Sequence, residues 1–170
     1  VQALMRTAGD AGMDLLVLDA VERANAAQKQ VLGGKILKRF GVDLKGLNFA
    51  LWGLAFKPNT DDLREAPSRV LLAELLARGA RVTAYDPVAM PEARQIYKAE
   101  SRVRFADSPM AALDGADALA IVTEWKEFRS PDFQRIKQVL RTPAIFDGRN
   151  LYDPAEVRNN GLEYYPIGRL

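Results

Sequence analysis

The chain has 170 residues, 48% of them hydrophobic, and a formal net charge of +2. This size and apolar content fit a globular protein with a proper core and exclude the disordered and collagen-like classes. The absence of cysteine and histidine excludes disulfide scaffolds, thiolate metal sites and a cysteine nucleophile, and it removes the commonest general base. We therefore expect no catalytic residue and no metal site in this chain.

Charge and hydropathy also limit the expected partners. The positive residues are dispersed rather than run together, so nucleic acid is not an expected partner. No apolar run reaches the roughly 18 residues that a bilayer crossing needs, and no charged-then-apolar leader opens the sequence. We expect a cytoplasmic protein that does not bind a membrane.

The first 45 residues are predicted to be helical. A helix end is expected over 1–8, stopped by Gly9 and Gly12, and a longer helix from an Asp14 N-cap to residue 40. Gly33 and Gly34 lie inside the longer helix, where they either kink or break it or let another backbone come close. Small and apolar residues follow the helical spacing, so we interpret 1–45 as a dimerisation segment that packs against a second copy.

From residue 47 onward, apolar runs typical of strands alternate with helical patterns. The predicted strands are 47–52, 81–87, 103–107, 116–125, 144–150 and 162–168. The predicted helices between them are 68–79, 90–100, 108–115, 130–141 and 153–160. Gly79 is expected to end the first of these helices, and the dipeptides Ser108-Pro109 and Ser130-Pro131 to open two others. The alternation predicts an α/β Rossmann-like doubly wound parallel sheet of about six strands over 46–170, preceded by a long helix.

The segment "GLAFKPNTDDLREAPS", residues 53–68, follows the first strand. In a doubly wound sheet, ligands bind beyond the carboxyl ends of the strands, and this segment leaves one of the central ones. It has only Gly53 where a dinucleotide site has Gly-x-Gly-x-x-Gly, so the Lys57 side chain is the candidate for a phosphate contact. Arg149, after the fifth strand, offers a planar fork to the same ligand. Trp52 and Phe56 are expected in the core, with stacking of a ring on a nucleobase as the alternative.

Other polar residues have two interpretations each. Asp86 ends the second strand, where it forms either a ribose-binding carboxylate or an Asp-Pro turn, and the turn is favoured. The run 123–125 is expected to face the same crevice. Asp61 and Asp62 could hold Mg²⁺, but further oxygen ligands are not evident, so a salt-bridged loop that caps the next helix is favoured for Asp61 and Glu65.

Taken in order, several segments resemble the C-terminal half of the nucleotide-sugar 6-dehydrogenases, most closely those that act on UDP-glucose. These segments are "VQALMRTA", "VERANAAQK", "GLAFKPNTDDLREAPS", "VTAYDP", "ADALAIVTEW" and "IFDGRN". The resemblance implies a two-step, NAD-dependent oxidation of UDP-glucose to UDP-glucuronate on a catalytic cysteine. It also implies an N-terminal NAD-binding domain, a central helix that forms a homodimer, and a C-terminal domain that binds the UDP-sugar.

The resemblance assigns roles to four residues of this chain. Phe56, Lys57 and Arg149 would bind the nucleotide-sugar, and Arg64 would contact NAD. The family's cysteine motif precedes the point that matches Val1, so we expect the cysteine and most of the NAD site outside this chain and the chain alone to be inactive. The alternatives are a relative acting on UDP-N-acetylmannosamine or GDP-mannose, and a non-enzymatic Rossmann module that senses a nucleotide.

Overall fold

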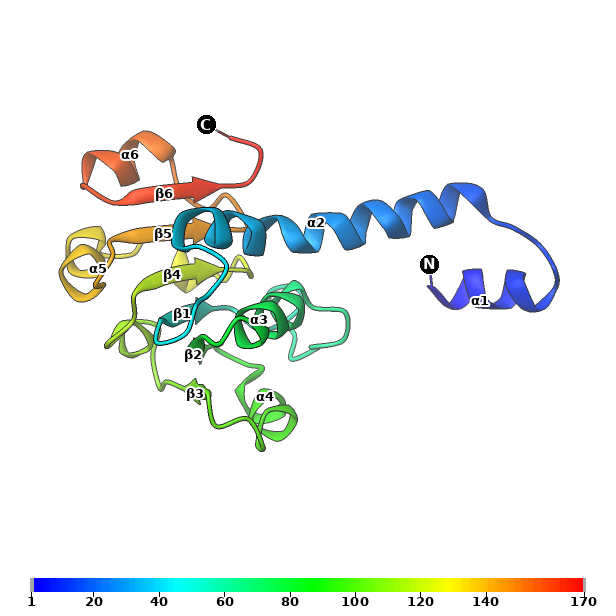
Figure 1. Cartoon of the computed structure of the whole chain (residues 1–170), viewed down its shortest axis with the longest axis horizontal. Coiled ribbons are helices and arrows are strands. Elements are labelled where there is room, and N and C mark those ends of the chain that lie inside the picture. Colours follow the sequence, from blue (N-terminus) through cyan, green and yellow to red (C-terminus); the bar gives the residue numbers. More distant parts are fainter. Residues whose placement is uncertain (1, 170) are drawn as a thin grey trace.

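The computed structural model describes residues 2–169 (Figure 1). Two helices, α1 (Gln2–Asp10) and α2 (Leu16–Phe40), come first. The strands that follow are β1 (Asn48–Trp52), β2 (Arg81–Tyr85), β3 (Val103–Phe105), β4 (Ala118–Ile121), β5 (Ala144–Asp147) and β6 (Glu163–Pro166). The helices between strands are α3 (Pro67–Ala77), α4 (Met90–Ile96), η1 (Ala111–Leu113), η2 (Lys126–Phe128), α5 (Phe133–Val139) and α6 (Pro154–Asn159), where η marks a 3₁₀ helix. Across residues 2–169, no helix combines the length and apolarity that a membrane span needs.

The strands form one parallel sheet in the order β3-β2-β1-β4-β5-β6. The chain runs outward from β1 to β3 and then returns to the centre at β4, which confirms the predicted doubly wound, Rossmann-like fold. The central strands β1 and β4 are buried along almost their whole length. Both of their faces are covered, which is why they read as continuous apolar runs in the sequence.

Helix α2 has a packed half and a projecting half. Its C-terminal half lies on the sheet and α3 and buries Leu32 and Ile36, whereas its N-terminal half projects beyond the carboxyl ends of the strands (Figure 1). The helix is continuous from Leu16 to Phe40, so a break into two helices at the two glycines is wrong. A Cβ atom at Gly33 would overlap the carboxylate at the end of the Glu74 side chain on α3, so this flexible side chain lies directly against the backbone of α2.

Three predicted helix starts are wrong. Helix α2 begins at Leu16, and its N-cap Leu15 makes no side-chain cap bond, since an exposed helix end can leave its first N–H groups to water. Helix α5 is capped by Asp132, whose carboxylate accepts from the backbone of Arg135, and not by the serine two residues earlier. Residues 108–115 form only the short 3₁₀ helix η1, which begins at Ala111, although the Ser108 hydroxyl does accept from the Ala111 N–H.

Asp86, at the end of β2, joins three loops at the carboxyl edge of the sheet. Its buried carboxylate accepts five hydrogen bonds of 2.7–3.0 Å, from the backbone N–H groups of Leu54, Ala55, Val88 and Ala89 and from the indole N–H of Trp125. A carboxylate offers about four lone pairs, so no acceptor remains for a ribose hydroxyl. The turn interpretation of Asp86 is therefore confirmed, and the same side chain also holds the loops after β1 and β4.

Gly53 brings the loop after β1 against the loop after β4. Its φ is +90°, and a Cβ atom there would lie 2.7 Å from the backbone nitrogen of Thr123. The buried Thr123 hydroxyl donates to the Ala55 carbonyl at 2.6 Å. The two loops are in direct contact, and any side chain at residue 53 would separate them.

Replacing Gly53 by alanine tests this contact. We expect Gly53→Ala to lower the free energy of unfolding by about 2–4 kcal/mol, from the left-handed backbone and the clash with Thr123. Gly34→Ala is the matched control, because Gly34 has no atom within 4 Å of an added Cβ and alanine favours a helix by up to about 1 kcal/mol. Urea unfolding measures both variants, and equal effects would contradict the contact.

Removing one oxygen of the Asp86 carboxylate tests its role as an anchor. In Asp86→Asn the new amide NH₂ faces N–H donors, and each buried donor left without an acceptor costs about 1–3 kcal/mol. We expect the thermal midpoint to fall by many degrees in Asp86→Asn. Asp107→Asn removes the same charge from a fully exposed side chain whose ion-pair partner Arg94 is 3.9 Å away, and it should leave the midpoint unchanged. A similar midpoint for both variants would show that Asp86 is dispensable.

Candidate functional site

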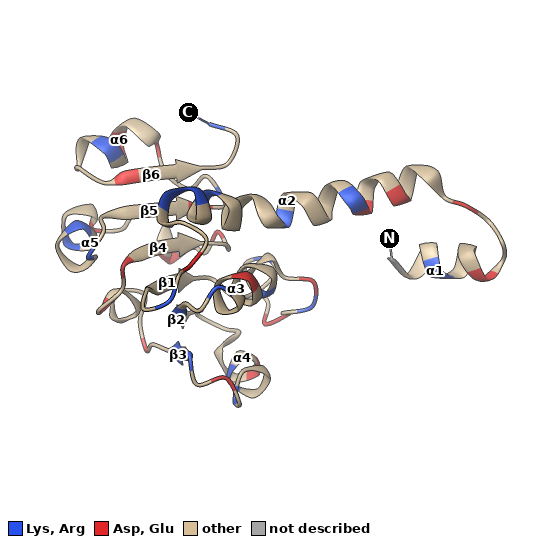
Figure 2. Cartoon of the chain, in the orientation of Figure 1, with Lys and Arg blue, Asp and Glu red and all other residues tan. Residues whose placement is uncertain are grey.

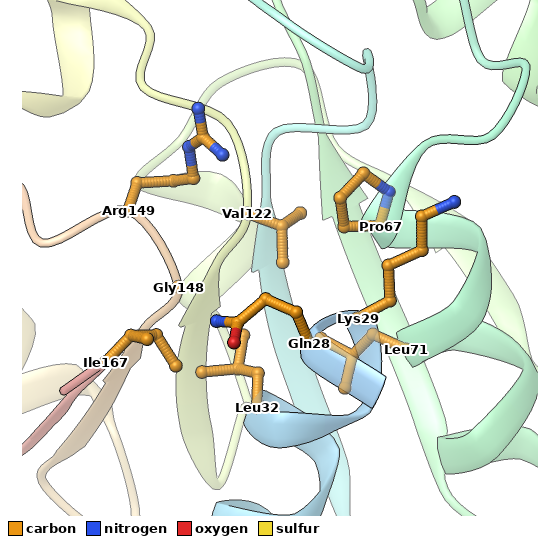
Figure 3. A pocket seen from close by; sticks show the side chains of 9 residues that line it. All are labelled: Gln28, Lys29, Leu32, Pro67, Leu71, Val122, Gly148, Arg149 and Ile167. Atoms are coloured by element: carbon orange, nitrogen blue, oxygen red, sulfur yellow. The ribbon is translucent and has the colours of Figure 1, made fainter. Parts of the chain in front are cut away.

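Two neighbouring pockets lie at the carboxyl edge of the sheet. One, of about 120 Å³, is formed by α2, α3 and the segments after β4, β5 and β6 (Figure 3). The other, of about 520 Å³, lies between α1, α2 and the loop after β1. They share Gln28, Lys29 and Pro67, and we call them together the edge pockets. Typical small-molecule sites have volumes of about 300–1,000 Å³, so the edge pockets together offer the space that a small ligand needs.

Lys29 is a site residue that sequence reasoning missed. It extends from α2, its side chain is 22% exposed, and its ammonium makes a 2.9 Å ion pair with Glu65 in the loop before α3. The expected salt bridge of Glu65 is thus confirmed, but its expected capping of α3 is wrong, since Ala66 is the N-cap and has no side-chain cap bond. A lysine beside a glutamine in the small-residue stretch of α2 was the only signal in the sequence.

Arg149 lies at the rim of the smaller pocket, on the opposite side from Lys29 (Figure 3). Its backbone N–H donates to the buried carboxylate of Asp147 at 2.8 Å, and its Nε donates to Glu124, which follows β4. Burial raises the pKa of Glu124, but the hydrogen bond and the charge of Arg149 outweigh it, and the net pKa lies below the ordinary value. Glu124 is therefore ionised at neutral pH and holds Arg149 at the pocket.

The side chains of Trp52 and Phe56 have different environments. Trp52 is buried, stacks on Phe128 with ring centroids 5.1 Å apart and donates its indole N–H to the Pro109 carbonyl, so its core position is confirmed. Phe56 is 46% exposed and lines the larger pocket, so its core position is wrong. The loop turns back at this point, where the Phe56 N–H donates to the Asp62 carbonyl at 2.8 Å, and this turn leaves the ring outside the core.

Lys57 and Arg64 lie on the outer part of the same loop, which carries both acidic and basic residues (Figure 2). Within residues 2–169 the exposed Lys57 ammonium makes no hydrogen bond or ion pair. The Arg64 side chain is 85% exposed and binds Asp62 through two hydrogen bonds of 2.9 and 3.0 Å. These bonds hold the pKa of Asp62 at about 2. Neither basic residue lines the edge pockets, whereas Phe56 and Arg149 do.

Two residues after β4 that were expected to face a ligand are used inside the protein. Thr123 bonds to the loop after β1, and Trp125 to Asp86. No group of three or more acidic residues suited to a metal is found among residues 2–169. With Asp86 saturated and only Gly53 in the loop, this unit lacks the glycine-rich loop and the free carboxylate with which a Rossmann domain usually binds a dinucleotide. The edge pockets are lined by Lys29 and Arg149 and also by Glu22 and Glu65, so they offer both charges to a polar ligand.

The sequence matches a family model and several curated relatives. The model described as "UDP-glucose/GDP-mannose dehydrogenase family, UDP binding domain" matches residues 50–154. A UDP-glucose 6-dehydrogenase of Pseudomonas aeruginosa is 52% identical over 172 residues, which is 99% of this chain and 38% of that protein. One of Rhizobium meliloti is 40% identical and covers 98% of this chain and 38% of its own length.

Solved structures of related dehydrogenases have the same fold. A UDP-glucose dehydrogenase from Pyrobaculum islandicum superposes with a TM-score of 0.78 at 31% identity, covering 96% of this chain and 34% of that one. An NDP-N-acetyl-D-galactosaminuronic acid dehydrogenase from Methanosarcina mazei gives a TM-score of 0.68 at 29% identity, covering 84% of this chain and 29% of that one. The chain thus spans less than two fifths of the length of these relatives. It belongs to the UDP-glucose/GDP-mannose dehydrogenase family, whose UDP-binding domain it contains.

Proposed function

We propose that this chain is the UDP-sugar-binding and dimerising part of an NAD-dependent UDP-glucose 6-dehydrogenase. The whole protein would oxidise UDP-glucose to UDP-glucuronate in two steps, with residues 1–45 as the dimerisation segment and 46–170 as the UDP-sugar domain. The observation that carries the proposal is the pair of edge pockets, rimmed by Lys29 and Arg149, in a chain with the family's UDP-binding domain.

Three residues of this chain are proposed to contact the nucleotide-sugar. The Lys57 ammonium makes no hydrogen bond or ion pair within residues 2–169, although its charge acts on the nearby Asp62, so it is available to a phosphate as a point charge. Arg149 uses its Nε on Glu124 and keeps its terminal nitrogens for a second phosphate oxygen. Phe56 presents a half-exposed ring to the larger pocket, where it can stack on a base or a sugar. Together they supply charge and an apolar face for one ligand.

NAD is proposed to bind mainly to the part of the protein outside this chain. When bound, NAD accepts the hydride in each oxidation step. The contribution of this chain is limited to Arg64, whose guanidinium is exposed and oriented by Asp62, so that it can reach an anion held by another domain. The chain by itself is predicted to be inactive. The cytoplasmic location expected from the composition also stays a prediction.

UDP binding is the direct test of the proposed UDP-sugar site. Calorimetry should detect UDP binding to the chain, and Lys57→Ala or Arg149→Ala should weaken it about tenfold, the loss of one charge-assisted hydrogen bond of about 1.5 kcal/mol. Two control variants each remove one positive charge from an exposed position: Lys98→Ala after α4 and Arg135→Ala on α5. Neither should change the affinity for UDP. A folded chain that does not bind UDP would overturn the proposal.

The relative affinities of three nucleotide-sugars separate the substrate alternatives. UDP-glucose should bind more tightly than UDP-N-acetylmannosamine or GDP-mannose. GDP-mannose remains an alternative because the matched family model includes GDP-mannose dehydrogenases by name. Equal binding of all three, with no preference for the sugar, would favour the non-enzymatic nucleotide-sensing module.

The projecting half of α2 is proposed to form the homodimer. Leu16 and Val17 are 74% and 77% exposed, and Val21 is also exposed. At 100° per residue, Val17, Val21 and Ala24 fall on one face of the helix. An exposed apolar face of this kind is typical of a surface that a partner covers.

Substitutions on two faces of α2 test this dimer. Ala24→Glu places a charge on the apolar face, and we expect it to shift the chain from dimer to monomer in light scattering. Gln30→Glu introduces the same charge on the opposite face and should leave the dimer intact. A monomeric unsubstituted chain, or equal dissociation of both variants, would contradict dimerisation through this face.

A further inference from the structure

A second cationic site lies at the amino edge of the sheet, on the opposite side from the edge pockets. Four arginines line a cleft of about 210 Å³ there: Arg81, Arg102, Arg104 and Arg141. Asn48 at the start of β1 and Thr83 in β2 also line it. We call this site the arginine cleft. Figure 2 shows basic residues on β2 and β3, which contribute its outer side.

Strand geometry explains why these side chains meet. Arg81 and Thr83 are two residues apart on β2 and therefore point to the same face of the sheet. Arg104 of β3 is the register partner of Thr83, and Asn48 of β1 is the partner of Arg81. The three neighbouring strands thus place two arginines, an amide and a hydroxyl on one face of the sheet.

The arginines of the cleft differ in how far they are neutralised. Arg102 has a carboxylate partner: it makes two hydrogen bonds to Glu100, at 2.7 and 2.9 Å, and one of 2.7 Å to the Leu76 carbonyl. Arg141 has a single 3.8 Å ion pair with Asp117, and its side chain is 63% exposed. In the described part of the chain, the side chains of Arg81 and Arg104 make no hydrogen bond or ion pair. Three guanidinium groups therefore face one small space with unused donors.

The positive charges of the neighbouring arginines repel one another, and a bound anion offsets this electrostatic repulsion. Guanidinium groups match the geometry of phosphate oxygens and bind them through paired hydrogen bonds. The cleft is smaller than the roughly 300–1,000 Å³ of pockets that hold whole small-molecule ligands, and the acidic Asp114 on its wall limits the negative charge that it accepts. We propose that the arginine cleft binds pyrophosphate, or a diphosphate group of that size, independently of the UDP-sugar site.

Titration with sodium pyrophosphate at constant ionic strength tests the proposal. We expect calorimetry to detect binding, and the double variant Arg81→Ala/Arg104→Ala to weaken it about tenfold or more. Arg135→Ala, on the exposed face of α5, is the matched charge control and should bind as the unsubstituted chain does. The side chains of Arg81 and Arg104 make no hydrogen bond or ion pair within residues 2–169. A thermal melt should therefore show that the double variant is folded.

A second measurement separates this site from the edge pockets. In ¹⁵N spectra of the chain, pyrophosphate should shift the amides of Asn48, Thr83 and Gly115, and Arg149→Ala, in the lining of the smaller edge pocket, should not change its affinity. Shifts confined to Gly53 and Gly148, or loss of binding in Arg149→Ala, would assign the anion to the edge pockets and overturn the proposal. Equal binding by the double variant would overturn it as well.

Discussion

The carboxyl edge of this protein depends on one buried carboxylate. Asp86 accepts hydrogen bonds from the chain after β1, from its own turn and from the tryptophan after β4. Because an unpaired buried donor is costly, these three segments are held in one arrangement. The close contact of Gly53 with Thr123 is possible only in that arrangement. In a dinucleotide-binding fold, the acidic residue at the position of Asp86 is free to bind a ribose. Here Asp86 holds the loops together, so side chains on the surrounding loops are the candidates for ligand contacts.

Helix α2 connects this framework to the rest of the molecule. Its packed half lies on α3 and the sheet through the buried Leu32 and Ile36, and Arg39 at its end makes two hydrogen bonds to Glu163 of β6, which lower the pKa of Glu163 to about 2. The same helix places Lys29 at the edge pockets, and its N-terminal half extends beyond the sheet with exposed Val17 and Val21 among charged residues. A single rigid element therefore sets the position of a site residue relative to the proposed dimer face.

The basic side chains at the two edges of the sheet differ in how many of them form ion pairs. At the carboxyl edge, Lys29, Arg64 and Arg149 each have a carboxylate partner that orients them, and Lys57 is the exception. At the amino edge, Arg81 and Arg104 have no carboxylate partner among residues 2–169. Ion pairs orient a cation but also compete with a ligand for it, so the carboxyl edge favours a precisely placed ligand and the amino edge a compact, highly charged one.

The apolar strands and their alternation with helices were predictable from the sequence, because strands buried on both faces need continuous apolar runs. The end of α3 was also predictable from a glycine: Gly79 ends this helix as expected, with φ +88°. The helix starts after Ser-Pro, the exposure of Phe56 and the role of Lys29 were not, because each depends on which segments meet in space. By itself the sequence determined the fold class and the loops that carry the candidate site. Only the tertiary structure decided which charges are paired and which are free, since ion pairs such as Lys29 with Glu65 join residues far apart in the chain.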